Sequence, residues 1–407
     1  MADTNPDDRQ KTLDEQEREQ QELLRPPDVN QESNRTATRL ELFFDLAFVL
    51  FVARCADLLA ADETWRGGLV FAALLTTGWW AWASSALYAN RFDTDDTVFR
   101  LLTLGGMAGV VAMAASADDL AGAGGRWFAA GYVAVRAVLV LGYLRAWWHV
   151  PRARPSIRPY LLGHSAGGVL WLVSIAVPEP VRYGLWAAGV LVDLAGPTLA
   201  ARRKDGVPLH LEHLPERFGL FVILVLGESV AAVVTGLHDG GWKPPVATAG
   251  GLGLVVAACL WWVYFDLAGG AAKRELLEQG EGTRQGVHDL YVYLHLPIAV
   301  SLAAVAVGLE DAVLHAGDEH LDTGARWVLA IGLSGYLLSC GVIQAVLSGG
   351  ARGPLLWPGA GVPAVLVVTW FDPGPVTLLG LLAAVLLLGL TAGIAEHRGG
   401  WVRTAKV

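Results

Sequence analysis

Charged residues and cysteines are scarce in this sequence. Only 17% of its 407 residues are charged and 54% are hydrophobic, a composition that excludes an ordinary soluble protein. The three cysteines, Cys55, Cys259 and Cys340, all lie in apolar stretches, which excludes a disulfide framework and a CxxC zinc site. The formal net charge of −9 argues against binding to nucleic acid.

The motifs of common enzymes are also missing. The sequence contains no HExxH, GxSxG or Walker A motif, and no GxGxxG between a strand and a helix. We therefore expect neither an enzyme nor a bound cofactor or metal ion. An intramembrane enzyme that acts on a lipid stays open, because paired carboxylates can perform acid–base chemistry. It ranks last, since no nucleophile or metal cluster accompanies them.

Long apolar stretches dominate what is present. Stretches of about 20 residues, the length that a helix needs to cross a bilayer, recur almost from end to end. They predict an all-α, polytopic integral membrane protein with about twelve transmembrane helices. The expected spans are 40–61, 67–88, 97–117, 127–149, 159–177, 182–200, 214–237, 246–268, 290–310, 325–347, 354–371 and 375–394.

The positive charges predict the orientation of these spans. Cytoplasmic loops retain Lys and Arg, and with a cytoplasmic N-terminus the twelve-span scheme places 21 of the 30 on that side and 5 in the outer loops. The other four lie within spans or at their edges. We therefore expect both termini in the cytoplasm.

Three segments fall outside the spans. Residues 1–38 form an acidic N-terminal tail that cannot bury a core, and we expect it to be disordered on the cytoplasmic side. Residues 201–213 form a basic cytoplasmic linker, and residues 395–407 form a cytoplasmic C-terminal tail. These segments divide the chain into a first six-helix membrane repeat, 39–200, and a second one, 214–394.

The two halves carry matching motifs in the same order. Glu41-Leu-Phe43 opens the first span and Glu216-Arg-Phe218 opens the seventh, while Trp79-Trp80-Ala-Trp82 corresponds to Trp261-Trp262-Val-Tyr264. Each match is weak alone, but their shared order indicates one duplication. Six helices per repeat give both halves the same orientation, as in transporters built from parallel repeats.

Ionisable residues inside the spans are the candidate functional residues, because a charge within a membrane is costly. Glu41 and Asp45 share one helix face and need a partner across the bundle. Glu228 lies about 18 Å into its span, where it either pairs with a cation such as Arg136 or stays protonated. The candidate ion- or substrate-binding residues, most of them on the cytoplasmic side, are Glu41, Asp45, Glu216, Arg217, Glu228, Asp266 and His295.

Several of these residues also have a purely structural explanation. Glu216 follows Pro215 and suits the first turn of a helix, where the helix dipole favours a carboxylate. A lone His295 is more often a satisfied core residue, and the tryptophans before Asp266 suit an aromatic belt. The charges expected to be structural or gating are Arg54, Asp57, Arg136, Asp193 and Glu310, with Arg54–Asp57 and Arg136–Asp193 as ion pairs.

Glycine and proline mark further features of the spans. The run Gly163-x-x-x-Gly167-Gly168 permits close contact between helices. Pro297 and Pro363 indicate helix breaks.

Five short motifs together resemble one protein family. They are Glu41-Leu-Phe-Phe-Asp45-Leu-Ala-Phe48, Asn90-Arg-Phe-Asp93-Thr-Asp-Asp96, Glu216-Arg217-Phe-Gly219 with Leu226-Gly-Glu-Ser229, Trp262-Val-Tyr-Phe-Asp266, and His295-Leu-Pro297 with Gly308-Leu-Glu310. From about residue 35 to 395 the chain resembles the bacterial low temperature requirement A protein family. That resemblance implies a multi-spanning protein of the bacterial inner membrane, linked by its name to growth in the cold, and transfers no catalytic residue.

Together these features favour a secondary-transporter-like or ion/proton-permeation protein whose two repeats surround a polar core. The alternative is a non-transporting membrane scaffold or regulator needed for growth in the cold, with the intramembrane charges as structural ion pairs. Access of water to the polar core distinguishes the two. The expected partners are membrane lipids and an unidentified small solute or ion, and a homo-oligomer stays open.

Overall fold

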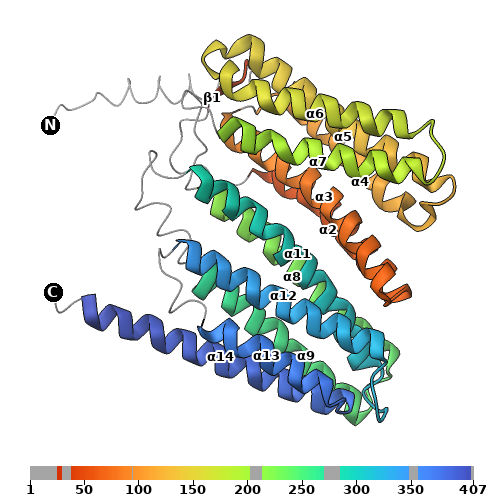
Figure 1. Ribbon diagram of the computed structural model, residues 1–407, viewed down its shortest axis with the longest axis vertical. Helices are drawn as coiled ribbons and strands as arrows, with labels where there is room; N and C mark the ends of the chain where they lie inside the picture. The colour runs from red at the N-terminus through yellow and green to blue at the C-terminus, as the bar shows by residue number, and fades with distance from the viewer. Residues whose placement is uncertain are drawn as a thin grey trace, which may run out of the picture. The chain divides into compact units, whose positions relative to one another are not determined.

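The computed structural model describes residues 25–29, 38–93, 95–201, 213–269, 285–347 and 356–404. Most of these residues lie in α-helices, so the fold is all-α, as the sequence predicts (Figure 1). The helices are α2 (Arg39–Ala61), α3 (Trp65–Arg91), α4 (Thr97–Ser116), α5 (Gly124–His149), α6 (Arg154–Ser174), α7 (Val181–Ala201), α8 (His213–Asp239), α9 (Pro244–Trp262), α11 (Gln285–Leu314), α12 (Thr323–Leu347), α13 (Leu356–Trp370) and α14 (Pro375–Thr404).

Each of the twelve predicted segments falls on one of these helices, with the main differences in extent at α11, which is longer than the predicted span 290–310, and at the C-terminal end. Helix α13 has 15 residues, fewer than the predicted span 354–371, and α14 continues to Thr404 through most of the predicted tail 395–407. Pro297 and Pro363 lie inside α11 and α13, which continue past them, so the predicted breaks are wrong. Such prolines are tolerated where neighbouring helices satisfy the freed backbone groups.

Several helices are suited to a membrane. Seven segments of the described chain are long and apolar enough to cross one, and Pro358–Trp370 is apolar but shorter. The seven are Thr97–Asp119, Gly124–His149, Leu214–Asp239, Pro244–Ala268, Leu290–Leu314, Thr323–Ala345 and Pro375–Ala395. The structure therefore supports a protein with several membrane spans, and the count of twelve stays a prediction.

The helices form two compact units, which we describe separately. Unit 1 comprises Met1–Ala47 and Ala81–His210, and unit 2 comprises Phe48–Trp80 and Leu211–Val407. The boundary near residue 210 lies at the predicted linker 201–213, most of which is outside the described residues. Helices α2 and α3 contribute to both units, whereas the predicted division at 39–200 and 214–394 assigns them whole to the first repeat.

Unit 1 is built around consecutive helix pairs. Helix α5 packs against α4 and α6, and α6 packs against α7. One end of this bundle holds an aromatic core, in which Tyr143 of α5 meets Tyr88 of α3 edge-on at 5.0 Å and stacks on Tyr160 of α6 at 5.5 Å. Large rings that pack in this way contribute both buried area and favourable ring geometry, so they fix how these three helices meet.

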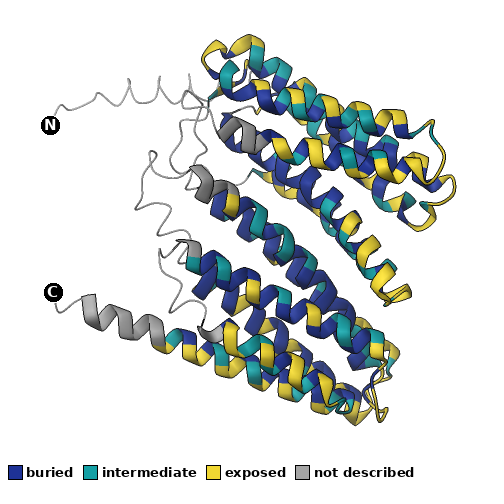
Figure 2. Cartoon of the chain, in the orientation of Figure 1, coloured by how far each residue is buried: buried dark blue, intermediate teal, exposed yellow. Residues whose placement is uncertain are grey.

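Unit 2 is organised around helix α11. It packs against α8 and α12, while the pairs α12–α13, α13–α14, α14–α9 and α9–α8 complete a closed order. Figure 2 shows α11 buried along most of its length, whereas α14 alternates buried and exposed positions. Helix α9 ends in a π-helix, η3 (Val263–Gly269). Such wide turns frequently occur at functional sites.

Part of the predicted disordered tail is ordered. Strand β1 (Asp28–Val29) pairs antiparallel with strand β2 (Phe92–Asp93), with Val29 opposite Phe92. The expectation of disorder throughout residues 1–38 is therefore wrong at Arg25–Val29. The composition of the tail predicts that it cannot form a core of its own, but the tail gains order here by docking onto the bundle.

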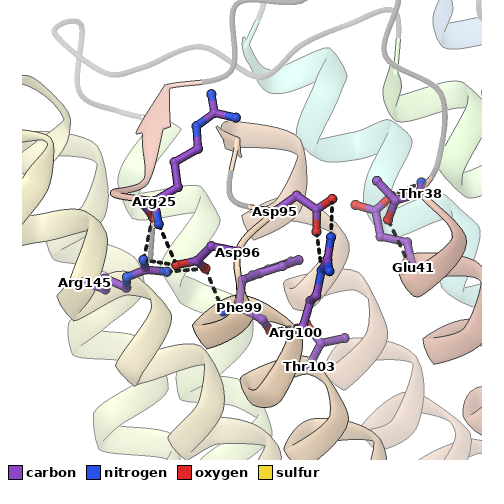
Figure 3. Close-up of polar contacts among 9 residues, drawn as sticks. All are labelled: Arg25, Thr38, Glu41, Asp95, Asp96, Phe99, Arg100, Thr103 and Arg145. Atoms are coloured by element: carbon purple, nitrogen blue, oxygen red, sulfur yellow. Dashed lines mark hydrogen bonds and ion pairs between the residues drawn. The ribbon is translucent and has the colours of Figure 1, made fainter. Parts of the chain in front are cut away.

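A buried ion pair holds this segment in place. Both terminal nitrogens of Arg145 on α5 bind the two carboxylate oxygens of Asp96, at 2.9 and 2.5 Å, and Nη2 also donates to the carbonyl of Arg25 at 2.6 Å (Figure 3). Asp96 accepts further bonds from the backbone N–H of Arg25 and of Phe99, the second of which caps α4. A bidentate pair of this kind is both strong and specific in geometry.

Candidate functional site

The structure divides the seven predicted site residues between the two units. Glu41 and Asp45 belong to unit 1, and the other five belong to unit 2. Glu41 forms a capping box with Thr38: its carboxylate accepts the N–H of Thr38 at 2.9 Å, and the Thr38 hydroxyl accepts the N–H of Glu41 at 3.2 Å (Figure 3). These two bonds satisfy backbone donors at the start of α2.

Asp45 is fully buried and accepts a hydrogen bond from the indole Nε1 of Trp82 on α3, at 2.8 Å. The sequence predicts that this carboxylate needs a partner across the bundle, and Trp82 is one. A buried carboxylate with hydrogen-bond donors of this kind is fixed in orientation, so Asp45 serves to join α2 to α3.

The predicted residues near the start of α8 and the end of α9 differ in their exposure. Glu216 is half-buried in the first turn of α8, as expected of a helix-capping carboxylate, and Arg217 is buried. Asp266 is exposed, and so are the nearby Trp261 and Trp262. This exposure favours the aromatic belt over a binding pocket at the end of α9.

His295 of α11 is a satisfied core residue. Its Nδ1 lies 2.7 Å from the carbonyl of Tyr291, and its Nε2 lies 2.7 Å from the hydroxyl of Tyr264 on η3. Because a carbonyl can only accept, Nδ1 carries the hydrogen and Nε2 accepts the hydroxyl of Tyr264. The neutral ring is thus fully bonded, as in the structural explanation given by the sequence.

A second buried charge cluster occupies the middle of unit 1. The carboxylate of Asp193 on α7 lies 3.2 Å from Nε of Arg136 on α5 and 3.2 Å from Nδ1 of His164 on α6, and it accepts the hydroxyl of Tyr132 at 2.9 Å. Arg136 also donates to Ser84 at 2.9 Å. The predicted Arg136–Asp193 pair is confirmed.

Glycine makes room for this cluster. A Cβ atom on Gly167 would lie 2.7 Å from Oδ1 of Asp193 and 2.9 Å from the carbonyl of Gly189, both closer than real Cβ contacts. The predicted close approach at Gly163-x-x-x-Gly167 therefore occurs between α6 and α7, and it lets the buried carboxylate reach His164.

Unit 2 has an open acidic cavity at one end. The cavity has a volume of about 630 Å³ and is bordered by the α2–α3, α11–α12 and α13–α14 connections. Six carboxyl groups and two imidazoles line it, from Glu63, Glu310, Asp311, Asp318, Asp322, Asp372, His315 and His320. We call this the acidic cavity.

Few positive charges offset these carboxylates. His315 pairs with Asp311 at 3.0 Å, and His320 and Arg326 both contact Asp372. Within the described ranges, no three His, Cys, Asp or Glu side chains are arranged to hold a metal ion. The acidic cavity is thus suited to attracting cations in their hydrated form or as protons, through its field rather than through a preformed coordination shell.

Glu63 is the most perturbed carboxyl of this cavity outside the helices. It lies between α2 and α3 and accepts a hydrogen bond from the backbone N–H of Ala325 in the first turn of α12. Burial, together with the charges of Asp311 and Asp322, raises the pKa of Glu63 to about 7. Its charge therefore changes near neutral pH.

Further carboxylates continue from the cavity into the helices. Glu310 lines the cavity about 6 Å from the end of α11 along its axis. It lies within electrostatic range of Asp57 on α2 and of Glu228, which is half-buried about 16 Å from the end of α8. Asp57 also forms the predicted pair with Arg54, at 2.9 Å and with both side chains partly exposed.

Sequence reasoning missed Glu63, Asp322, Asp372 and His164. It considered charges inside the spans and interpreted the Glu310–Asp311 end of α11 mainly as solvated. A signal for the cavity was nevertheless available, because the α2–α3, α11–α12 and α13–α14 connections all lie on the same side in the predicted alternation. No pattern in the sequence singled out His164, whose partners lie on other helices.

Comparison with known proteins agrees with the fold and with the motifs. The family model of the bacterial low temperature requirement A protein (LtrA) matches residues 36–392. The uncharacterized protein RA0937 of Rhizobium meliloti (strain 1021) is 25% identical over 288 residues, which cover 68% of this chain and 69% of that protein. With its apolar helices, the chain is a bacterial membrane protein. It belongs to the bacterial low temperature requirement A protein family.

Proposed function

We propose that this chain is a secondary-transporter-like or ion/proton-permeation protein that accepts protons or small cations at the acidic cavity of unit 2. The observation that carries the proposal is the cavity itself, in which carboxylates from three connections meet Glu310 of α11. Glu228 and Asp57 continue the series of carboxyl groups into α8 and α2. Ionisable groups inside membrane helices mark ion pathways or proton relays in many membrane proteins.

The cavity is suited to collecting cations before they enter the helices. A cleft lined by charge of one sign focuses the field and raises the local concentration of counter-ions. Glu310 belongs both to the cavity lining and to a segment apolar enough to span a membrane, Leu290–Leu314. Glu310 therefore lies between the acidic cavity and the deeper carboxylate of Glu228.

Exposed tryptophans support the proposal that further helices cross the membrane. Trp65, Trp127 and Trp370 are exposed at the ends of α3, α5 and α13 that face predicted outer loops. Trp148 and Trp262 are exposed at the opposite ends of α5 and α9. Tryptophan concentrates at both membrane interfaces, so this pattern supports spanning roles for α3 and α13. In the orientation predicted from the positive charges, the acidic cavity would lie at the outer face of the inner membrane.

Helix packing supports the proposed duplication. In unit 1 the successive helices α4, α5, α6 and α7 pack pairwise, and in unit 2 the helices α11, α12, α13 and α14 do the same. These two sets occupy equivalent places in the two proposed six-helix repeats. A parallel repeat of this type is known in secondary transporters, although that likeness is an analogy of architecture.

The proposal is tested by flux through the purified protein. Full-length protein is reconstituted into liposomes with a trapped pH dye, a proton or cation gradient is imposed, and a panel of cations and small solutes is added. We expect flux in the wild type and its loss in Glu228→Gln. Glu319→Gln, which changes an exposed acid outside the cavity lining, should keep the wild-type rate. Equal flux in all three proteins, or none in folded wild type, contradicts the proposal.

The second candidate is a non-transporting scaffold or regulator that accommodates lipids in the cold. It is favoured by the pairing of the buried polar groups at Arg136–Asp193, Asp45–Trp82 and His295–Tyr264. Under this alternative the partners are membrane lipids alone, and the intramembrane charges only hold helices together. Absence of flux across the whole panel, with specific phospholipids retained through purification, is the result that this alternative predicts.

A further inference from the structure

His164 of unit 1 occupies a position with two conflicting neighbours. Its Nδ1 lies 3.2 Å from Oδ1 of Asp193 and 3.4 Å from Nη1 of Arg136. Asp193 can only accept a hydrogen bond and Arg136 can only donate one. A hydrogen on Nδ1 therefore serves Asp193, while a bare Nδ1 serves Arg136, so the two neighbours stabilise opposite tautomers.

The other ring nitrogen of His164 is left open. The side chain is 1% exposed, and among the described residues its Nε2 has no hydrogen-bond partner. Buried polar atoms are almost always bonded, so an exception in a native structure indicates a specific role. With hydrogen on Nδ1 directed at Asp193, Nε2 presents a lone pair that is available without breaking any existing bond.

We propose that His164 is a proton-binding site within unit 1, which accepts a proton from the aqueous phase at Nε2 while its Nδ1–H stays bonded to Asp193. An N–H bond forms at Nε2 and an O–H bond of hydronium breaks, so the neutral imidazole becomes an imidazolium and one water molecule is released. Asp193 keeps its hydrogen bond to Nδ1–H and stabilises the positive charge of the imidazolium, as carboxylates that neighbour a histidine do in other proteins. This site is independent of the acidic cavity of unit 2.

The groups around the ring define the site. On α5, the ring of Tyr143 stacks on the imidazole of His164 with 5.7 Å between the ring centroids, and Arg136 and Tyr132 belong to the same cluster. Asp193 of α7 faces Nδ1 of His164. The ring of Tyr160 on α6 lies 6.2 Å from the imidazole, measured between centroids. Helix α3 contributes Ser84, which binds Arg136, and Arg91, which donates to Tyr160. Of these residue types, histidine is the one whose ordinary pKa lies between pH 5 and 8.

The ligand proposed for this site is a proton. A methyl group on Gly167 would approach Asp193 to 2.7 Å, so α6 and α7 are in close contact beside the carboxylate. The permanent charge of Arg136 is balanced by Asp193, which leaves His164 as the group that can add a net charge to the cluster.

The test observes the ring nitrogens directly. Full-length protein labelled with ¹⁵N-histidine is placed in lipid nanodiscs, its ¹⁵N spectrum is recorded from pH 4 to 8, and His164→Asn identifies the signals of His164 among the ten histidines. We expect one bare and one protonated nitrogen at high pH and two protonated nitrogens at low pH.

Two tyrosine variants test the role of Asp193. Tyr132→Phe removes a donor from Asp193 but keeps its charge, so the carboxylate should favour the imidazolium more and raise the titration midpoint by about 0.3 pH unit, a twofold gain in proton affinity. Tyr183→Phe, ten residues from Asp193 on the same helix, should leave the midpoint unchanged. A His164 ring that keeps one neutral form throughout, or an unchanged midpoint in Tyr132→Phe, overturns the proposal.

Discussion

Nε1 of Trp82 donates a hydrogen bond to Oδ1 of Asp45 over 2.8 Å, and both side chains are fully buried. Three residues earlier on the same helix, Trp79 is equally buried, and its Nε1 has no hydrogen-bond partner among the described residues. The two indoles therefore differ in hydrogen bonding while sharing residue type and burial.

This difference predicts unequal effects of the same substitution. Trp82→Phe leaves the buried Asp45 without one of its donors and should lower the free energy of unfolding by about 1–3 kcal/mol more than Trp79→Phe does. Thermal unfolding of both variants in detergent provides the measurement. Equal losses of stability would show that the bond to Asp45 contributes nothing beyond packing.

Gly167 should be far less tolerant of a side chain than its neighbour Gly168. A Cβ on Gly167 meets Asp193 at 2.7 Å, whereas one on Gly168 meets side-chain carbons of Arg136 at 3.4 and 4.0 Å, which are ordinary contact distances. Gly167→Ala should therefore separate α6 from α7 and destabilise the protein by about 1–3 kcal/mol. Gly168→Ala should be close to neutral in the same unfolding assay, and the reverse order would contradict the packing described for the Asp193 cluster.

Two adjacent acids at the start of α4 should respond differently to loss of charge. Asp96 is buried and bound by Arg145, whereas Asp95 forms an exposed pair with Arg100 at 2.9 Å. Asp96→Asn keeps a capping side chain but removes the ionic bond, and should cost about 1–3 kcal/mol. Asp95→Asn should cost less than about 1 kcal/mol.

The Asp96 effect should also depend on pH. Burial alone would raise the pKa of Asp96, but hydrogen bonds from Arg145 and from the N–H of Phe99 hold it below its ordinary value. A lowered pKa in the folded state stabilises the protein above the unfolded pKa and loses this effect as pH falls. The difference in the free energy of unfolding between wild type and Asp96→Asn should therefore become smaller below about pH 4. If the free energies of unfolding of wild type and Asp96→Asn differ by the same amount at pH 7 and at pH 3, this account is contradicted.

Glu63 should give the opposite pH dependence. Its pKa is raised from 4.5 to about 7, chiefly by burial, so the folded state binds this proton more tightly than the unfolded state. The resulting stabilisation is complete below about pH 4.5 and is lost as pH rises through 7. Between pH 5 and 8, wild type should therefore lose thermal stability relative to Glu63→Gln, which can still accept the N–H of Ala325.

The matched control for this prediction is Glu319→Gln. Glu319 is an exposed acid of the α11–α12 connection that does not line the acidic cavity. The thermal unfolding midpoint of Glu319→Gln should follow that of wild type across the pH range. Parallel curves for wild type and Glu63→Gln would show that the carboxyl of Glu63 does not titrate near neutrality in the folded protein.

The helices were predictable because each depends on a local property. Apolar stretches near the length of a bilayer crossing place all twelve, and α11 and α14, with 30 residues each, extend furthest beyond the predicted spans 290–310 and 375–394. The Arg136–Asp193 pair was predictable for a different reason, since a buried charge inside a span needs an opposite charge and few were available.

The surroundings of these residues were not predictable, because they depend on which helices meet. Spacing along the chain places Glu41 and Asp45 on one face, but it does not show that Thr38 and Trp82 satisfy them. The docking of Arg25 depends on Arg145, 120 residues later in the chain. The acidic cavity combines residues of three connections, and no single segment carries a motif for it.

The most direct test of the central claim is whether water reaches Glu228 from the acidic cavity. Single cysteines replace Glu310, Glu228, Asp318 and Leu388, and a charged, membrane-impermeant thiol reagent is added to intact cells. Asp318 lines the mouth of the cavity, and Leu388 is an exposed apolar residue in a segment suited to a lipid environment. The native Cys55, Cys259 and Cys340 are buried and serve as internal negative controls.

The account predicts that Glu310→Cys and Glu228→Cys react, as Asp318→Cys does, while Leu388→Cys stays unmodified. Reaction at Asp318→Cys together with complete inertness at both Glu310→Cys and Glu228→Cys would contradict a water-filled path and support the scaffold.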